Sequence, residues 1–526
     1  MKMKTNKFMT YALSAMMLGS LAACSSDDSE PDNGGNSGGE TTDTPYVWGT
    51  EGSIKTCDHL LFNEDKSENK KGTVIGNGDQ EFVFKGTQTL AKGTYLLKGW
   101  VYVGAGSTLT IEPGTVIKGD KDTQAALIIE PGGKLIAEGK QDAPIVFTSE
   151  MPKGQRKPGD WGGLIICGKA KNNQGVLNQQ IEGGPRTKHG GDDDSDNSGI
   201  IRYVRVEFAG YPFMKDKEIN GITFGSVGSG TTIDHLQVSY SNDDSYEWFG
   251  GSVNCKYLVA YNGWDDEFDT DNGFSGKIQY GLSIRDPRIA DTSQSNGFES
   301  DNCADGSLVS PYTTAVFSNI TFIGPLGRDA GFTNDESYIN AGSFNPNNGS
   351  ALGKFQSAMQ IRRSSRLNCF NSVAVGYPVG LIIDGEKGNT VEQAQEGIIN
   401  LQNINIWFAG MTVTGSDANK VYDDVLYDAV NKTIIDAGQE SYSSSFFKAQ
   451  KGNKVLADMN ELNFKDGRGI GVNYMPNANS PVLTAASFDN ALLDNGFDKV
   501  DYIGAFGIND NWLDGWTNFD PNNTDY

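Results

Sequence analysis

Acidic and aromatic residues recur three times between residues 241 and 302. Each unit sets an aromatic residue beside several carboxylates and amides, in segments 242–248, 264–271 and 295–301. Aligned on Tyr246, Phe268 and Phe298, the units are 22 and 30 residues apart. One acid directly follows each aromatic: Glu247, Asp269 and Glu299. Spacings of this size are typical of a solenoid, in which equivalent residues of successive coils stack. The three acids would then form a ladder of like charges, which is unfavourable unless something compensates it.

A bound calcium ion is one way to compensate the repulsion among these carboxylates, and the composition of the three units suggests it. It takes six to eight oxygen ligands from carboxylates, amides, carbonyls and water. The candidate ligands are Asp243, Asp244, Glu247, Asp266, Asp269, Asp271, Glu299 and Asp301. The alternative is a solvated acidic face whose repulsion is relieved by water, salt and nearby arginines. The sequence leaves both interpretations open.

A second acidic segment, residues 191–199, has the alternating spacing of the first half of a calcium loop. The acids concerned are Asp192, Asp194 and Asp196. The bidentate glutamate that such a loop needs is absent, because Tyr203 occupies its position. A turn between coils is therefore the favoured interpretation, with calcium binding as the weaker alternative.

Short alternating strands separated by glycine-containing turns predict the element that positions these acids. Two Ile-Glu-Pro-Gly corners, beginning at Ile111 and Ile129, lie 18 residues apart. Later segments share the pattern apolar-x-x-apolar-x-apolar-x-aromatic, at residues 201–208, 233–240 and 401–408. This pattern predicts an all-β fold, a parallel β-helix over residues 95–410.

The second strand of each coil is expected to carry two columns of residues. An apolar column would face the core: Ile222, Tyr246, Phe268, Phe298, Phe332 and Leu381. The neighbouring column would face outward: Thr223, Glu247, Asp269, Glu299 and Thr333. Threonine precedes and follows the acids in this column, so the repeat itself does not require carboxylates there.

The remaining segments are expected to flank the solenoid. Residues 46–94 would form an N-terminal β cap, and residues 411–526 an irregular C-terminal cap with short helices at 421–430 and 487–493. Residues 1–23 combine basic residues with a short apolar run, as a lipoprotein signal peptide does. Cys24 would then carry the lipid, and residues 24–45 would be an acidic flexible tether.

Composition narrows the choice of partners. The 526-residue chain has a formal net charge of −24. This charge argues against nucleic acid as a partner, since phosphate binding needs a basic surface.

Three cysteines in strand-like segments, Cys167, Cys255 and Cys369, are expected to be buried thiols.

Enzymatic activity is a further hypothesis for the acidic units. Polysaccharide lyases and glycoside hydrolases with β-helix folds use paired carboxylates, or calcium with a basic residue. The weak catalytic candidates are Asp265, Asp266, Asp269, Arg285 and Arg288. Because this assignment depends on analogy of fold, binding is favoured over catalysis.

Several segments resemble a family of Bacteroidetes outer-membrane β-helix lipoproteins. They are residues 160–163, 190–210, 246–251, 265–287, 295–302 and 516–521. The resemblance covers most of the chain after the signal peptide and implies a right-handed parallel β-helix, similar to the pectin-lyase fold, on the cell surface. It implies no catalytic residues.

The sequence thus predicts an outer-membrane lipoprotein, anchored by its lipid and exposed at the cell surface. Its acidic β-helix face would bind a glycan, another nutrient or an outer-membrane transporter, with Ca²⁺ as the possible cofactor. A calcium-dependent polysaccharide lyase or glycoside hydrolase is the first alternative. A structural or adhesive surface protein is the second.

Overall fold

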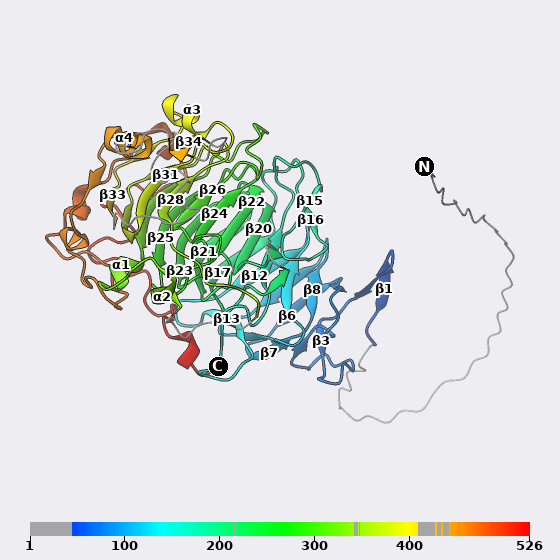
Figure 1. Cartoon of the computed structure of the whole chain (residues 1–526). Helices are drawn as coiled ribbons and strands as arrows, with labels where there is room; N and C mark the ends of the chain where they lie inside the picture. Colours follow the sequence, from blue (N-terminus) through cyan, green and yellow to red (C-terminus); the bar gives the residue numbers. More distant parts are fainter. Residues whose placement is uncertain are drawn as a thin grey trace, which may run out of the picture. The chain divides into compact units, whose positions relative to one another are not determined.

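Successive coils of the chain stack so that their strands pair in parallel, which makes the protein a parallel β-helix (Figure 1). The computed structural model describes residues 45–214, 217–340, 346, 348–408, 427–428, 433–434 and 441–526. Residues Tyr46–Tyr526 form one compact unit. The fold class expected from the sequence is confirmed.

One row of stacked strands, called sheet A here, carries the acid ladder. Its strands, in order, are β1 (Trp48–Glu51), β2 (Ile54–Cys57), β5 (Phe82–Phe84), β8 (Trp100–Val103), β11 (Ala126–Ile129), β14 (Gly163–Cys167), β20 (Ile222–Val227), β22 (Tyr246–Gly251), β24 (Phe268–Asp271), β26 (Phe298–Ser300), β28 (Ser357–Ile361) and β31 (Val379–Ile383). Only β1 and β2 pair antiparallel within this row.

The other strands of the stack form sheet B, which begins as two rows of short strands. One row is β6 (Thr87–Leu90), β9 (Thr108–Ile111) and β12 (Lys134–Glu138); the other is β3 (Leu61–Phe62), β4 (Val74–Ile75), β7 (Thr94–Leu97), β10 (Val116–Gly119) and β13 (Ile145–Ser149). Both rows join at β17 (Gly199–Glu207), because β12 pairs with its first half and β13 with its second.

Longer strands continue sheet B after this junction. They are β21 (Thr232–Ser239), β23 (Cys255–Tyr261), β25 (Lys277–Ile284) and β27 (Val316–Ile323), followed by the shorter β29 (Asn368–Phe370), β30 (Val373–Tyr377), β32 (Leu401–Gln402), β33 (Asn405–Phe408) and β36 (Lys454–Val455). Three small antiparallel pairs lie outside both sheets: β15–β16 (Gln179–Gln180, Lys188–His189), β18–β19 (Pro212–Met214, Lys217–Glu218) and β34–β35 (Tyr427–Asp428, Thr433–Ile434).

Each long strand bends at one residue in the left-handed region of backbone space. In successive coils these residues are Tyr203, His235, Tyr257 and Tyr280, with φ between 48° and 63°. Their rings stack directly, at centroid separations of 4.3, 4.3 and 4.8 Å. A positive φ is unfavourable for residues other than glycine, so the stacking and the surrounding coils must stabilise the bend.

The apolar columns expected from the sequence form the core. Ile201 pairs with Ile233, Val204 with Leu236, and Val206 with Val238. In sheet A, Ile222, Tyr246, Phe268 and Phe298 are adjacent in register and fully buried. Burial of each such large side chain stabilises the fold by roughly 1.5–3 kcal/mol.

The residues expected after Phe298 in the apolar column and after Glu299 in the outward column are wrong. Met359 and Gln360 of β28, rather than Phe332 and Thr333, pair with Phe298 and Glu299. Phe332 packs against Phe355 outside the stack. The chain between β27 and β28 leaves the coil through α1 (Pro325–Arg328) and α2 (Glu336–Ile339), so the Phe-Thr-Asn sequence lies in an excursion.

Parallel stacking begins before residue 95, where the sequence placed the start of the solenoid. β4 pairs in parallel with β7, β5 with β8, and β6 with β9. The antiparallel pairs β1–β2 and β3–β4 cover the first coil. The region expected to be a separate cap is therefore largely part of the β-helix.

Helix α4 (Tyr442–Ala449) covers the end of the stack. It lies within residues 411–526, which the sequence predicts to be a C-terminal cap. Phe446 and Phe447 join the main core, and Ser443 Oγ accepts a hydrogen bond from the backbone N–H of Ile383 at 2.9 Å. A further helix, α3 (Thr390–Gln395), follows β31. The helix expected at 421–430 falls largely outside the described residues, and its described part, Tyr427–Asp428, is strand β34.

From residue 486 onward the chain does not cap the solenoid but runs back along the outside of sheet B. Along this segment, Ser487 contacts Asn371, Asp498 contacts Gln279 of β25, Ala505 contacts Thr321 of β27, and Asn518 contacts Gln237 of β21. The segment thus begins beside a late coil and reaches earlier coils, with one step back between residues 498 and 505. The backbone oxygen of Tyr526 accepts a hydrogen bond of 2.8 Å from Lys118 Nζ of β10. We call residues 486–526 the C-terminal strap (Figure 1, red).

The strap covers the stacked ring column of the bends. Trp512 and Trp516 meet the His235 ring edge-on, at 6.4 and 5.5 Å. Within the strap, only Ala491–Leu493 of the expected helix 487–493 forms a 3₁₀ turn.

Two further expectations concern single features. Cys167, Cys255 and Cys369 are buried free thiols, as expected. Among the residues that the structure describes, no helix is long and apolar enough to span a bilayer.

Candidate functional site

The acid ladder exists as the sequence predicts, on the face of sheet A that points away from the core. Glu247 of β22 pairs in register with Asp269 of β24, and Asp269 with Glu299 of β26. In this column Thr223 precedes the acids and Gln360 follows them. Carboxylates therefore occupy three consecutive steps of a column that is neutral on either side.

The ladder lines a cavity of about 960 Å³ instead of an open surface. Excursions from the coils contribute to its walls with residues 182, 212, 218, 291–293 and 348–351. Glu247 and Asp244 are only 6% and 7% exposed. The walls therefore limit the contact of Glu247 and Asp244 with solvent, in contrast to an open acidic face.

Twelve carboxylates line this cavity, which we call the acidic cavity. They are Glu182, Glu218, Asp243, Asp244, Glu247, Asp265, Asp266, Asp269, Asp271, Asp291, Glu299 and Asp301. The turns before strands β22 and β24 contribute Asp243, Asp244, Asp265 and Asp266, and the strands themselves contribute the ladder. The sequence signal for the ladder also locates this cavity, since both derive from the same three units.

Burial and mutual repulsion raise the pKa values of the cavity acids. Burial is the largest cause for Asp243, Asp244, Glu247, Asp265, Asp266 and Asp269, whose pKa values lie well above the ordinary range. Neighbouring carboxylates add to it: Asp269 raises the pKa of Glu247, and Glu299 that of Asp269. The pKa of Asp271 rises to about 7 through burial and then through Asp301.

Two arginines that the sequence analysis missed compensate one end of the cavity. Arg362 donates from Nε to Asp301 Oδ1 at 2.8 Å and also contacts Glu299 through Nη2. Arg363 donates to Asp301 Oδ2 at 2.6 Å. Both follow β28 directly, so the Arg-Arg pair would have been found if β28 had been identified as the next coil.

The arginines proposed from the sequence do not line the cavity. Arg285 is fully buried beneath it, in an ion pair of 2.7 Å with Glu267, and donates to the backbone oxygens of Asp265 and Trp264. Arg288 stacks on Tyr338 at 4.2 Å and donates to its backbone oxygen. Both therefore make structural contacts, and neither belongs to the lining of the cavity.

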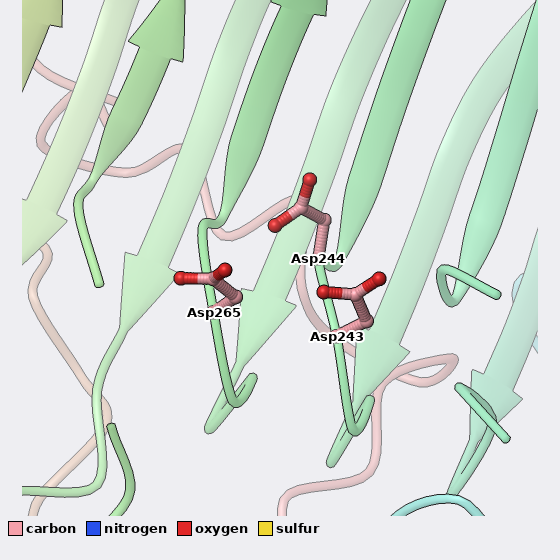
Figure 2. Close-up of side chains that lie close together, drawn as sticks. All are labelled: Asp243, Asp244 and Asp265. Atoms are coloured by element: carbon pink, nitrogen blue, oxygen red, sulfur yellow. The ribbon is translucent and has the colours of Figure 1, made fainter. Parts of the chain in front are cut away.

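Two groups of three carboxylates lie close enough to share a cation. In the first group are Asp243, Asp244 and Asp265; in the second are Asp244, Glu247 and Asp269. Within each group one oxygen from every residue lies within 4.8 Å of the others. Figure 2 shows the first group, with Asp243 and Asp244 on one turn and Asp265 on the turn of the next coil.

The other predicted metal ligands already have protein partners. Asp266 Oδ1 accepts a hydrogen bond from the backbone N–H of Asn296, and Asp271 Oδ1 one from Asn272 at 2.5 Å. Glu299 and Asp301 pair with Arg362. These four acids line the cavity without joining either group of three.

The acidic turn at 191–199 does not assemble a cluster of its own. Asp194 pairs with Lys171 at 2.5 Å, and its side chain is 51% exposed. Asp192 is exposed, whereas Asp196 is buried and accepts a hydrogen bond from Ser198 Oγ at 3.3 Å. The three side chains belong to no cation-sized group among the described residues, so a turn is the better interpretation.

The lining of the cavity defines the chemistry available to it. Its charged side chains are carboxylates and the two arginines, and its described lining contains no histidine, cysteine or lysine. Carboxylate oxygens are ligands for hard cations, and raised pKa values let them exchange protons for such cations. The arrangement is thus suited to holding cations, with part of their coordination open to a ligand in the cavity.

Comparison with known proteins agrees with the fold. A family model described as pectate-lyase like beta helix domain matches residues 83–446. No curated protein and no solved structure matches the chain.

Proposed function

Because the chain belongs to the family of pectate-lyase-like β-helix domains, we propose that it binds an acidic polysaccharide through calcium ions held in the acidic cavity. The proposed role is that of a non-catalytic binding or accessory protein. One observation carries the proposal: the carboxylates of the cavity outnumber its basic groups twelve to two.

The excess charge is concentrated at one end of the cavity. Arg362 and Arg363 pair with Glu299 and Asp301. No lysine or arginine of the described chain forms an ion pair with the six acids at the other end: Asp243, Asp244, Glu247, Asp265, Asp266 and Asp269. Buried carboxylates without an opposite charge in contact are strongly unfavourable, so these acids must carry protons or bind cations. Calcium fits an all-oxygen site better than a transition metal does.

An acidic polysaccharide is the ligand that such ions would recruit. A calcium ion bound by three carboxylates keeps coordination positions for oxygens of a second molecule. Sugar carboxylates and hydroxyls supply such oxygens, and a negatively charged chain would be repelled by the cavity without calcium. The volume of about 960 Å³ is at the upper end of the range for small-ligand sites, so it accommodates a few sugar residues.

A calcium-dependent polysaccharide lyase is the second candidate, favoured by the arginines beside the acids in one cavity. A lyase needs a base that removes a proton next to the sugar carboxylate, and calcium would acidify that proton. Arg362 and Arg363 are however both engaged with Asp301, at 2.8 and 2.6 Å. Binding is preferred because neither guanidinium is free to approach a substrate.

Affinity electrophoresis and a cleavage assay with polygalacturonate test the two candidates together. We expect retardation of the protein in gels with polygalacturonate and calcium, and none with EGTA or with a neutral glucan. Glu247→Gln with Asp269→Asn should abolish retardation, whereas Asp192→Asn on the outside should leave it unchanged. Unsaturated products absorbing at 235 nm would support the lyase instead, and no retardation under any condition would refute binding.

We further propose that Cys24 carries a lipid anchor at the outer membrane, with the cavity facing outward. The signal-like residues 1–23 and the Leu-Ala-Ala-Cys sequence ending at Cys24 support this location. An outer-membrane transporter is the protein partner that this location suggests. Labelling with radioactive palmitate should be lost in Cys24→Ala, and protease treatment of whole cells should remove the wild-type protein. Protection from protease in intact cells, with labelling retained, would contradict the outward orientation.

A further inference from the structure

We infer that the acidic cavity holds two divalent cations that share Asp244 as a common ligand. The inference rests on the proposed function, because it concerns the cations through which the ligand would bind. One cation lies among Asp243, Asp244 and Asp265, and the other among Asp244, Glu247 and Asp269.

The distances within each group fit calcium. Calcium–oxygen bonds are about 2.3–2.6 Å long, so two ligands on opposite sides of one ion are separated by roughly 4.6–5.2 Å. The candidate oxygens of each group lie within 4.8 Å of one another. Three carboxylates can therefore surround one calcium ion in either group without a change of the backbone.

Each group contains a carboxylate oxygen that the protein leaves without a partner. Asp265 Oδ1 in the first group and Asp269 Oδ1 in the second are buried and accept no hydrogen bond. A buried acceptor without a partner costs about 1–3 kcal/mol, and more when it is charged. A cation in each group would satisfy both oxygens, whereas a single cation would leave one of them unsatisfied.

Charge balance also favours two ions over one. The two groups together contain five carboxylates: Asp243, Asp244, Glu247, Asp265 and Asp269. One divalent ion would compensate two of these charges, and two ions would compensate four. The remaining charge would face the open positions of the ions, where a sugar hydroxyl or water coordinates without adding charge.

Asp244 is placed to bridge the two ions. A carboxylate has two oxygens with about four acceptor directions, so it can bind a metal on each side. The backbone N–H of Asp266 donates to Asp244 Oδ1 at 2.8 Å, which fixes the orientation of the carboxylate. Asp244 is 7% exposed and belongs to both groups, whereas each of the other four acids belongs to one.

Calcium stoichiometry of the purified chain and its variants tests the inference. Equilibrium dialysis followed by elemental analysis should give two calcium ions per wild-type chain at physiological salt. Asp243→Asn and Glu247→Gln, each affecting one group, should each leave one ion. Asp244→Asn should weaken both ions at least tenfold in calorimetric titration. The control Asp192→Asn, at an exposed acid outside both groups, should keep two ions.

Each alternative result has a definite meaning. One ion in the wild type, lost in all three cavity variants, would overturn the pair but leave the proposed function intact. Loss of only one ion in Asp244→Asn would overturn the bridge. More than two ions that moderate salt displaces would indicate a diffuse counter-ion layer and overturn the assignment. Absence of any calcium binding would refute the proposed function as well.

Thermal unfolding in EGTA shows whether a variant is folded before its ions are counted. All three cavity variants should unfold at or above the wild-type temperature, because each removes a buried acid that repels its neighbours. The wild-type stoichiometry needs no variant, so the two-ion inference stays testable even if one substitution prevents folding.

Discussion

Arg285 and Glu267 form an ion pair of 2.7 Å in which neither side chain is exposed. The pair lies beneath the acidic cavity and holds the turn that carries Asp265, because Arg285 Nη1 also donates to the backbone oxygen of Asp265 at 2.6 Å. Phe355 covers the guanidinium from the adjacent excursion, at 5.1 Å. A buried guanidinium thus supports two elements of the cavity wall without entering the cavity.

Arg285→Ala is therefore expected to destabilise the protein by about 3–5 kcal/mol, because it leaves Glu267 buried without its partner. Urea unfolding followed by circular dichroism measures this change. Arg288→Ala, which removes a partly exposed stacking contact, should cost no more than about 1 kcal/mol. If Arg285→Ala unfolded like the wild type while losing activity on a glycan, the structural role would be refuted.

Glu247→Gln combined with Asp269→Asn should stabilise the calcium-free protein while abolishing its stabilisation by calcium. Both acids have pKa values well above the ordinary range through burial and mutual repulsion. Amides remove the repulsion, with an expected gain on the order of 1 kcal/mol per group at pH 7.5. Differential scanning fluorimetry with EGTA or millimolar calcium gives both readouts.

A lower melting temperature of this double variant in EGTA would mean that the two carboxylates are structural. Thr223→Val, one step earlier in the same column, is the matched control and should keep the calcium-dependent shift.

Arg362→Gln is expected to tighten calcium binding two- to tenfold. Arg362 pairs with Glu299 and Asp301, so its removal makes the cavity more negative and frees two further carboxylates. Calorimetric titration measures the affinity, and Arg362→Lys, which keeps the charge, should stay near the wild type. Weaker binding by Arg362→Gln would instead show that the arginine holds the acids in position for the ion.

His189 should make stability depend on pH. Burial lowers the pKa of His189 to about 3, and its Nδ1 lies 2.8 Å from Ser226 Oγ. In the unfolded chain a histidine titrates near pH 6.5. Between these values the unfolded state binds one more proton than the folded state. The free energy of unfolding therefore decreases as the pH is lowered, by up to about 1.4 kcal/mol per pH unit.

Comparison of the wild type with His189→Gln isolates this effect, because the cavity acids titrate alike in both proteins. The stability of the wild type relative to the variant should fall by roughly 1 kcal/mol between pH 6.5 and 5.5, as measured by urea unfolding. A difference that stays constant over this interval would mean that His189 takes up a proton in the folded state.

Trp516→Ala should destabilise the protein by about 3–5 kcal/mol and loosen the C-terminal strap. The Trp516 side chain is fully buried, donates to the backbone oxygen of Trp512 at 2.6 Å and meets the Tyr203 ring at 5.9 Å. Limited proteolysis should release the strap from the variant first. Trp48→Ala, at a ring that is 42% exposed, should cost much less and leave the strap protected.

Local periodicity was sufficient to predict the β-helix and the register of the ladder. Tyr246, Phe268 and Phe298 recur in similar units, and each is followed by an acid, so alternation along a strand determines which column faces the core. The same reasoning failed after Phe298, because the chain leaves the coil before β28 and returns only at Ser357. Phe332 matched the pattern by chance within that excursion.

Burial of the ladder was not predictable, because the walls of the cavity come from excursions with no repeat of their own. Residues such as Asn348 and Ser350 line the cavity from a segment distant in sequence from the ladder. For the same reason the sequence did not reveal that Arg285, a weak catalytic candidate, is buried against Glu267, an acid of the second unit that points inward. Arg362 was missed because its strand was not identified.

The C-terminal strap changes how a chain of stacked coils should come apart. A solenoid held only by contacts between neighbours frays from its ends, like a one-dimensional array. Here residues 486–526 contact the stack from Asn371 back to Lys118, so coils far apart in the stack are tied to one another through a single segment. Docking of this segment thereby links coils that are not neighbours, and a folding chain acquires its full cooperativity only when the strap has docked. We expect a single unfolding transition for the intact protein and stepwise loss of coils once the strap is cut.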